Sequence, residues 1–353
     1  MYAIALLLLL SPFMGRTSVE ACNGGPSAPP YFKQGMNLGV HVFTDVNFTR
    51  HFNTSDEVQQ CVLRFFKSVF LRFRSAHRNL TLHLVNITIL NDTKVEDNCF
   101  VYHDHSTQRL LKPFTLKYVD LNQSMAKFKK CMKNTSSGAY LSEQAPIIYV
   151  LTGYDTAMKL GNEWKRWPGS ADKQGGVCSE SNLAIGPDKP GTFLGILSAV
   201  RLIGYLLGSQ YDGWRDNEHT RATDCHRVNH HVMSYYEDVA QSHKFSSCSL
   251  TEMETRLKNY TCDKARTKKV TIGSDVKYPG EDMTREMQCK KIDPKLYDQS
   301  KWYWYTCLVG CQTRRASGPV EVYPLLDGMT CYDRSNGHCY NGDCRTDVPN
   351  FSY

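Results

Sequence analysis

Fourteen cysteines constrain this 353-residue chain more than any other feature, and all of them lie between Cys22 and Cys344. An even number of cysteines in an oxidising compartment indicates disulfides, although spacing alone does not give their pairing. Asn-X-Ser/Thr sequons are dense, which fits the same compartment. The sequence therefore predicts a disulfide-bonded glycoprotein with candidate glycans on Asn47, Asn53, Asn79, Asn86, Asn91, Asn122, Asn134, Asn259 and Asn350.

Residues 1–21 are typical of a cleaved secretory signal peptide. The apolar run from Ala3 to Leu10 is far shorter than the ~20 residues that a membrane span needs. Val19-Glu20-Ala21 fits a signal-peptidase site, although no basic residue precedes the apolar run. No later stretch is long and apolar enough to cross a bilayer. We expect a secreted, extracellular protein with no membrane span.

The net charge of +7 is a mild excess for a chain of this length. No stripe of arginine and lysine is interleaved with aromatic residues, which argues against a nucleic-acid partner. A weak and unspecific attraction to acidic surfaces such as sulfated glycans is compatible with this charge.

Apolar periodicity predicts an α/β fold. β-Branched or alternating runs predict strands at 38–43, 80–90 and 145–152, the last covered on both faces because it is nearly all apolar. Helices are expected at 56–74, 120–132 and 192–207, with Asp56 as the cap of the first.

Changes in amino-acid composition along the chain suggest two folded parts. Residues 22–35 form a leader rich in glycine and proline, and residues 36–264 carry the strands and helices. Residues 265–353 are denser in cysteine, glycine and aromatic residues, which predicts a small module held by disulfides.

The segment RLIGYLLGSQYDG at 201–213 has the spacing of a zinc-protease helix. Such a helix carries two histidines at i and i+4 and a glutamate as general base, and in metzincins a glycine and a third histidine follow. Gly208 stands at the turning position, Asp212 follows the third ligand position, and Met233 lies in a segment that resembles a methionine turn.

The sequence resembles the reprolysin (adamalysin) branch of the metzincins. Further segments match in the family's order: IIYVLTGYDT, GGVCSESNLAIG, FSSCSLTEMETRLKNYTC, YPGEDMTREMQCK and LLDGMTCYDRSNGHCYNGDC. The last two are similar to elements of ADAMTS proteins, and the same pairing occurs in secreted salivary metalloproteases of ticks. The resemblance implies a metzincin-type mixed sheet with long helices, followed by a small disulfide-rich module.

None of the positions that would bind and use zinc holds a suitable residue. The three ligand positions are Arg201, Tyr205 and Tyr211, and the base position is Leu202. Arginine keeps its proton in proteins, and tyrosine would have to ionise from an ordinary pKa near ~10. We therefore predict no metal, no other cofactor and no catalytic residue, although zinc is the family's cofactor.

Two roles remain open for these three residues. In one, Arg201 and the tyrosines fill the former cleft; in the other, a basic and aromatic cleft binds a carboxylate or sulfate, which arginine can hold with two hydrogen bonds. His226 and His230 are also spaced i and i+4, with His231 beside them. Without a following glutamate they are expected to form a surface cluster, with a weak metal site as the alternative.

The resemblance also implies contacts elsewhere. By family analogy Cys225 pairs with Cys248 and Cys178 with Cys262. A metzincin binds peptides along an edge strand of its sheet, and the candidate edge is Asn182, Leu183, Ala184 and Ile185.

The most consistent hypothesis is a secreted reprolysin-like pseudoprotease that binds a peptide or protein. Its partner would be an extracellular protein, and the tick resemblance suggests a host haemostatic, immune or matrix protein. The alternative is an active secreted zinc metalloendopeptidase with a non-standard site. Integrin binding is a weaker alternative, because Asn341-Gly-Asp343 belongs to the cysteine-rich signature.

Overall fold

The computed structural model describes the greater part of the chain after the leader. The described residues are 35–77, 79–107, 114–134, 145–213, 225–226, 229–234, 243–258, 270–298, 307–313, 320–331 and 336–349. The expected signal peptide, nearly all of the leader and the boundary at 264 lie outside them. Residues 31–353 belong to one compact unit.

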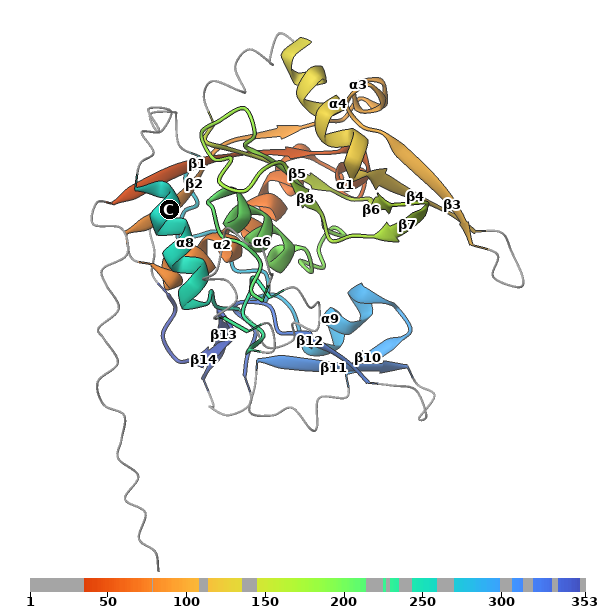
Figure 1. Cartoon of the computed structure of the whole chain (residues 1–353). Helices are drawn as coiled ribbons and strands as arrows, with labels where there is room; N and C mark the ends of the chain where they lie inside the picture. Colours follow the sequence, from red (N-terminus) through yellow and green to blue (C-terminus); the bar gives the residue numbers. More distant parts are fainter. Residues whose placement is uncertain are drawn as a thin grey trace, which may run out of the picture. The chain divides into compact units, whose positions relative to one another are not determined.

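A mixed five-stranded sheet organises the first part of the chain (Figure 1). Its strand order is β2-β1-β5-β9-β8, and all neighbours are parallel except β8, which runs antiparallel to β9. The strands are β1 (Met36–Thr44), β2 (Leu80–Ile89), β5 (Ile147–Thr152), β8 (Ser170–Ala171) and β9 (Leu183–Pro187). The expected α/β class is thus confirmed at this level.

Both faces of the central strands are buried, as the apolar run at 145–152 predicted. Tyr149 belongs to the core on one face of β5, and Val150, one position later, belongs to the core on the other. Alternate side chains of a strand point to opposite faces, so an almost wholly apolar strand fits a sheet covered twice. Figure 1 shows α2 (Ser55–Ala76) and α6 (Ile196–Leu206) on one side and α4 (Leu121–Asn134) on the other.

A second sheet of four strands extends this arrangement. Its order is β3-β4-β6-β7, from β3 (Tyr102–Thr107), β4 (Phe114–Asp120), β6 (Asp155–Leu160) and β7 (Glu163–Arg166). The turn before β6 is held by Asp45, which accepts hydrogen bonds from Thr152 Oγ1 and from Gly153 N and also caps α1 (Val46–Thr49). Burial raises the pKa of Asp45 to about 6.

The C-terminal part contains short elements joined by disulfides. It comprises α9 (Arg285–Ile292), a sheet of β10 (Leu296–Asp298), β11 (Leu308–Thr313) and β12 (Glu321–Pro324), and a hairpin of β13 (His338–Tyr340) and β14 (Asp343–Arg345). The disulfides here are Cys289–Cys311, Cys307–Cys339 and Cys331–Cys344. Two helices not yet placed are α3 (Thr93–Cys99) and α8 (Ser247–Leu257).

Helix α2 is the element on which both parts of the chain pack. The hydroxyl of Thr54 caps its N-terminus, two residues before the expected Asp56. Phe66 and Phe70 pack into the core under the sheet. On other sides Lys67 Nζ donates to Val276 O, and Arg72 forms an ion pair with Asp327 in which the two side chains are 3% and 1% exposed. No helix in the described residues is long and apolar enough to cross a membrane.

Removal of the Arg72 guanidinium should destabilise the protein strongly, because it leaves the Asp327 carboxylate buried without a counter-ion. For Arg72→Met we expect the free energy of unfolding in urea to fall by about 3–5 kcal/mol. The matched control is Arg166→Met, which removes the exposed pair with Asp155 and should change stability little. Equal losses in the two variants would contradict the importance of the buried pair.

Candidate functional site

Helix α6 begins at Ile196, four residues after the expected Thr192. The reason is Asp188, which is 3% exposed and accepts hydrogen bonds from Gly195 N at 2.9 Å and Thr192 Oγ1 at 3.4 Å. The carboxylate holds these residues in a turn before the helix. Burial raises the pKa of Asp188 to about 7.

Helix α6 ends in a turn that requires glycine at position 208. Ser209 N donates to Gly204 O and Gly208 N donates to Tyr205 O, both at 3.0 Å, which is the Schellman pattern. Gly208 has φ of +111°, and a Cβ there would lie 2.6 Å from Arg256 Cβ. This turn sends the chain back past the end of the helix toward Tyr211.

Arg201, at the first expected ligand position, is tied to the segment that resembles a methionine turn. Its Nε donates to Val232 O at 2.7 Å, and only 7% of the residue is exposed. The next residue, Met233, is buried beneath α6, where a Cβ on Gly204 would lie 3.1 Å from Met233 Sδ. The guanidinium therefore joins α6 to this turn.

Tyr205 and Tyr211, at the other two expected ligand positions, stack on each other. Their ring centroids are 6.0 Å apart and the ring planes differ by 25°. Both residues are half-buried. Burial raises the pKa of Tyr205, opposed by a hydrogen bond from the backbone of Gln174. A raised pKa makes the phenolate form rarer, which disfavours metal binding through this oxygen.

Asp212 also connects the chain that follows α6 to the turn that contains Met233. Its backbone N donates to Met233 O at 2.9 Å, and its Oδ1 accepts from Ser246 Oγ at 2.7 Å and Ser249 Oγ at 3.3 Å at the start of α8. Burial raises the pKa of Asp212. The expected scaffold residues Gly208, Asp212 and Met233 thus share one small region.

Leu202, at the expected base position, points to strand β8. A Cβ on Gly169, just before β8, would lie 2.8 Å from Leu202 Cδ1 and 2.5 Å from Ile185 O. Gly169 has φ of +109°, so only glycine fits this position easily. Strand β8 therefore borders α6 next to the residues described above.

The expected edge strand at Asn182–Ile185 was wrong. Strand β9 lies between β5 and β8, and Asn182, Leu183, Ala184 and Ile185 are at most 3% exposed. Strand β8 is at the end of the sheet instead, which makes Ser170 and Ala171 the edge next to α6. Leu183, Ala184 and Ile185 are apolar because both faces of β9 are covered, and the buried Asn182 donates from Nδ2 to Ala145 O.

The residues at the expected metal position do not fit zinc. A zinc site needs neutral imidazoles, thiolates or carboxylates directed at one point. Here a permanent cation bonded to a carbonyl and two stacked phenols occupy the three ligand positions, and Leu202 supplies no base. This arrangement places two half-buried tyrosines near the edge strand β8, which α6 contacts.

The described histidines of CHRVNHHVM do not form a ligand cluster. His226 is exposed and His230 and His231 are half-buried, and no three of their nitrogen atoms and neighbouring carboxylates lie within 4.8 Å of one another in the described chain.

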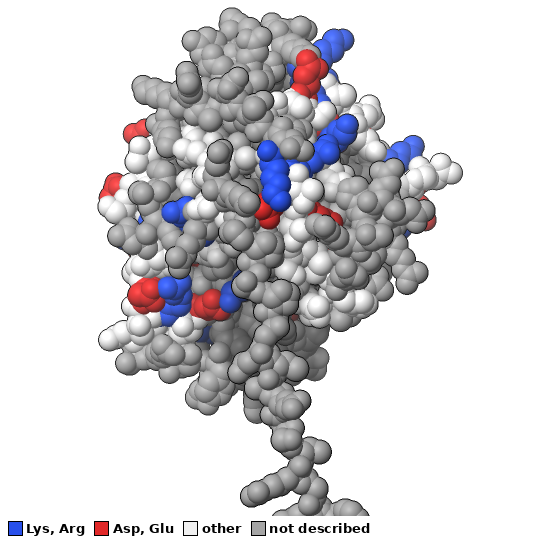
Figure 2. Space-filling view, turned by 60° about the vertical axis from the view of Figure 1, so that its left-hand side comes forward, with Lys and Arg blue, Asp and Glu red and all other residues white. Residues whose placement is uncertain are grey.

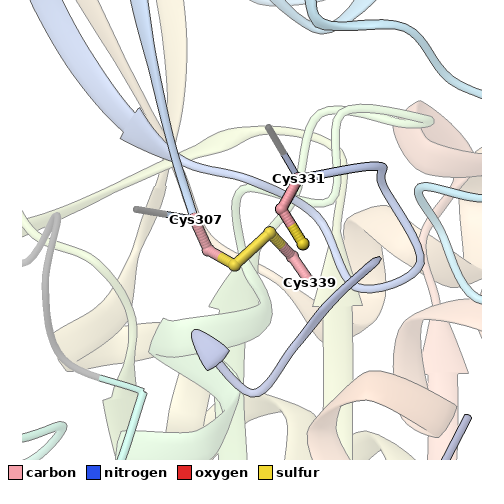
Figure 3. Close-up of side chains that lie close together, drawn as sticks. All are labelled: Cys307, Cys331 and Cys339. Atoms are coloured by element: carbon pink, nitrogen blue, oxygen red, sulfur yellow. A yellow bond between two sulfur atoms is a disulfide. The ribbon is translucent and has the colours of Figure 1, made fainter. Parts of the chain in front are cut away.

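The sulfurs of Cys307, Cys331 and Cys339 do lie within that distance (Figure 3). However, Cys307 is bonded to Cys339 and Cys331 to Cys344, so none is a thiolate available to a metal.

Two disulfides concern the pairs implied by the family resemblance. Cys225 is bonded to Cys248, the implied pair. Cys178 is disulfide-bonded, whereas Cys262 lies outside the described residues. A further disulfide joins Cys99 to Cys131. Cys61 is a buried free thiol, and burial raises its pKa to about 12.

The burial of Asn47 argues against the glycan expected there. Asn47 lies in α1 and is 6% exposed, which leaves no room for an oligosaccharide. Asn53, Asn79, Asn86, Asn91 and Asn122 are exposed, whereas the side chains of Asn134, Asn259 and Asn350 lie outside the described residues.

The surface also has a hollow away from α6. It measures about 560 Å³ and lies between the end of α2, the start of α8 and the β13–β14 hairpin. Lys244 and Asp343 at its rim form an exposed ion pair. On the face drawn in Figure 2, described basic and acidic side chains likewise lie beside one another.

Sequence reasoning missed β8 and Asp188. Strand β8 has two residues and no apolar pattern, and only the glycine before it hints at a close contact. Asp188 stands in the GPDKPG loop, where the sequence gives no sign that it is buried.

Comparisons with known proteins add little. No family model matches the chain, and no curated protein does. One matching solved structure, described as "Structure of a chaperone-substrate complex", has 9% sequence identity and a TM-score of 0.32, and the match covers 51% of this chain and 24% of that chain. At this level of similarity, neither fold nor function is transferred.

The raised pKa of Asp188 predicts a loss of stability as the pH rises. The folded state keeps the proton up to about pH 7, whereas the unfolded chain releases it near 3.8, so stability falls between these values. The shift corresponds to on the order of 4 kcal/mol.

Asp188→Asn keeps an acceptor for Gly195 N and removes the charge. Unfolding should be measured from pH 4 to pH 8 for both proteins. We expect the variant to gain stability over the natural chain as the pH rises. A difference that stays constant with pH would contradict the assignment.

Proposed function

We propose that this chain is a secreted reprolysin-like metalloprotease homologue that has lost zinc and proteolytic activity and binds an extended peptide of an extracellular protein. The observation that carries the proposal is the bond from Arg201 Nε to Val232 O beside the Tyr205–Tyr211 stack. Arg201 is bonded to a backbone carbonyl and the two tyrosines stack on each other, so these positions offer no imidazole, thiolate or carboxylate to a metal.

In this proposal the arginine takes over the structural task of the metal. A zinc ion would join α6 to the chain that follows its turn. Here three metal-free contacts do so: Arg201 to Val232, Asp212 to Met233, and the stack of Tyr205 on Tyr211. The sequence left two roles open for Arg201 and the two tyrosines. Because Arg201 is almost fully buried, we favour the role in which these residues fill the former cleft.

In this proposal the peptide binds along the edge of β8. Asp172 N donates to Leu183 O, so by the alternation of an antiparallel ladder Ala171 directs its N–H and C=O away from β9. An extended peptide can add to such an edge through main-chain hydrogen bonds. Tyr205 and Leu202 are on α6, which contacts β8, and Tyr211 stacks on Tyr205 after the turn that ends the helix.

Elemental analysis tests the loss of zinc. We expect the purified natural chain to hold far less than one zinc per molecule and not to cleave gelatin. The combined substitution Arg201→His, Leu202→Glu, Tyr205→His and Tyr211→His should bind about one zinc and restore cleavage that a chelator blocks. Circular dichroism checks that the variant folds.

Two outcomes would overturn this part of the proposal. Stoichiometric zinc and chelator-sensitive cleavage in the natural chain would establish the alternative, an active metalloendopeptidase. A folded fourfold variant without zinc would show that the four positions do not have metzincin geometry.

Peptides selected from a random library test the strand edge. Synthetic versions should lose about tenfold or more in affinity for Ala171→Pro, because proline removes the outward N–H. Ala171→Gly keeps that donor and should bind nearly as well as the natural chain, measured by fluorescence anisotropy. Equal affinities for the proline and glycine variants would exclude β8 as the binding edge.

A further inference from the structure

The hollow between the end of α2, the start of α8 and the β13–β14 hairpin has the size of a ligand site. Its volume of about 560 Å³ lies within the range of roughly 300–1,000 Å³ that is usual for small-molecule pockets. None of its described lining residues belongs to α6 or to β8. The hollow is therefore separate from the edge at which a peptide is proposed to bind.

One part of the wall is apolar. Leu71 of α2, Phe245 and Tyr340 of β13 are buried, and Leu250 of α8 is half-buried. All four residues line the hollow. Walls of this kind pack against the aliphatic or aromatic body of a ligand, while a few polar groups fix its orientation.

The hairpin side of the wall is fixed by covalent and packing contacts. Asn341 and Gly342 form the two-residue turn between β13 and β14, with φ of +52° and +80°. A Cβ on Gly342 would lie 2.5 Å from His243 Cδ2, so the turn packs closely on the segment before Lys244. The disulfides Cys307–Cys339 and Cys331–Cys344 anchor the two strands. A preformed wall lowers the entropic cost of binding.

Basic side chains outnumber acidic ones at the rim. Among the described lining residues, Asp343 is the one acid, beside Arg74, Lys244 and Arg345. Lys244 pairs with Asp343 at 2.8 Å, and both side chains are more than half exposed. Arg345 pairs in the same way with the exposed Asp347 at 2.5 Å. Exposed ion pairs contribute little to stability, so both cations can exchange their partners for the carboxylate of a ligand.

Two buried polar atoms of the lining residues lack a hydrogen-bond partner within the described chain. They are Arg72 Nε and Asn341 Oδ1, and the two residues are 3% and 7% exposed. The terminal Nη1 of Arg72 already donates to Ser68 O and to Asp327. Buried polar atoms nearly always have partners. A ligand with an acceptor for Nε and a donor for Oδ1 would supply the two that are missing.

We propose that the hollow binds a small organic acid, in which a carboxylate is joined to an apolar body. The carboxylate lies at the rim, where Arg345 holds it with two hydrogen bonds and Lys244 adds a further donor. The apolar body packs against Leu71, Phe245 and Tyr340. A fatty acid and an aromatic acid share this chemistry.

Fluorescence titration of the full chain with dansylaminoundecanoic acid tests the site, because this dye joins a carboxylate to an apolar body. The acid should bind at least about tenfold more tightly than its methyl ester, which lacks the charge. The double substitution Lys244→Met and Arg345→Met should weaken binding of the acid by about tenfold or more and leave binding of the ester unchanged. Lys165→Met removes an exposed cation on β7 and should bind the dye as the natural chain does.

Asp343→Asn tests the site in the opposite direction, because it releases Lys244 from its ion pair. The affinity for the acid should rise by about threefold. Displacement of the dye by dodecanoic acid but not by naphthoic acid would identify a fatty acid as the ligand class, and the reverse would identify an aromatic acid.

Absence of dye binding, equal affinities for the acid and the ester, or displacement by neither competitor would each overturn the proposal. So would an unchanged affinity in the double variant when circular dichroism shows that it is folded. If the double variant does not fold, Asp343→Asn decides, and an affinity that fails to rise counts against the site. Because the hollow shares no described residue with β8, each of these failures leaves the proposed function untouched.

Discussion

Two cations on α2 lie inside the protein, and much of the packing is arranged around them. Burying a charge without a partner costs far more than any one contact returns. Lys67 is 8% exposed and donates to Val276 O with its Nζ 4.4 Å from the ring centroid of Tyr278, and Arg72 pairs with Asp327. All of these partners follow residue 264. The C-terminal part therefore completes the core of the first part.

The end of α6 is likewise arranged so that its buried polar groups form hydrogen bonds. A guanidinium needs acceptors, a helix C-terminus needs donors, and a buried carboxylate needs hydrogen bonds. Val232 O, the amides of Gly208 and Ser209, and the hydroxyls of Ser246 and Ser249 meet these needs. These contacts join α6, the turn that contains Met233 and the start of α8 through protein groups.

Periodicity predicted the main elements because their burial is regular. The run at 145–152 is nearly all apolar and proved to be covered on both faces, and the helix expected at 56–74 buries Phe65 and Phe66 in the core. The family analogy misled us at Asn182–Ile185, where the apolar residues Leu183 to Ile185 indicate burial rather than an edge. Asn47 shows a related limit, because a sequon motif carries no information about exposure.

The pairing of Arg72 with Asp327 spans 255 residues of sequence. During synthesis α2 leaves the ribosome long before its counter-ion exists. Contacts of such high sequence separation slow folding and leave apolar surface exposed in the meantime. The sheet and α2 can assemble early, but their tight docking must wait for almost the whole polypeptide. The final packing of α2 is thus coupled to the synthesis of the segment that carries Asp327, and a nascent chain stalled before residue 327 would lack the counter-ion of Arg72.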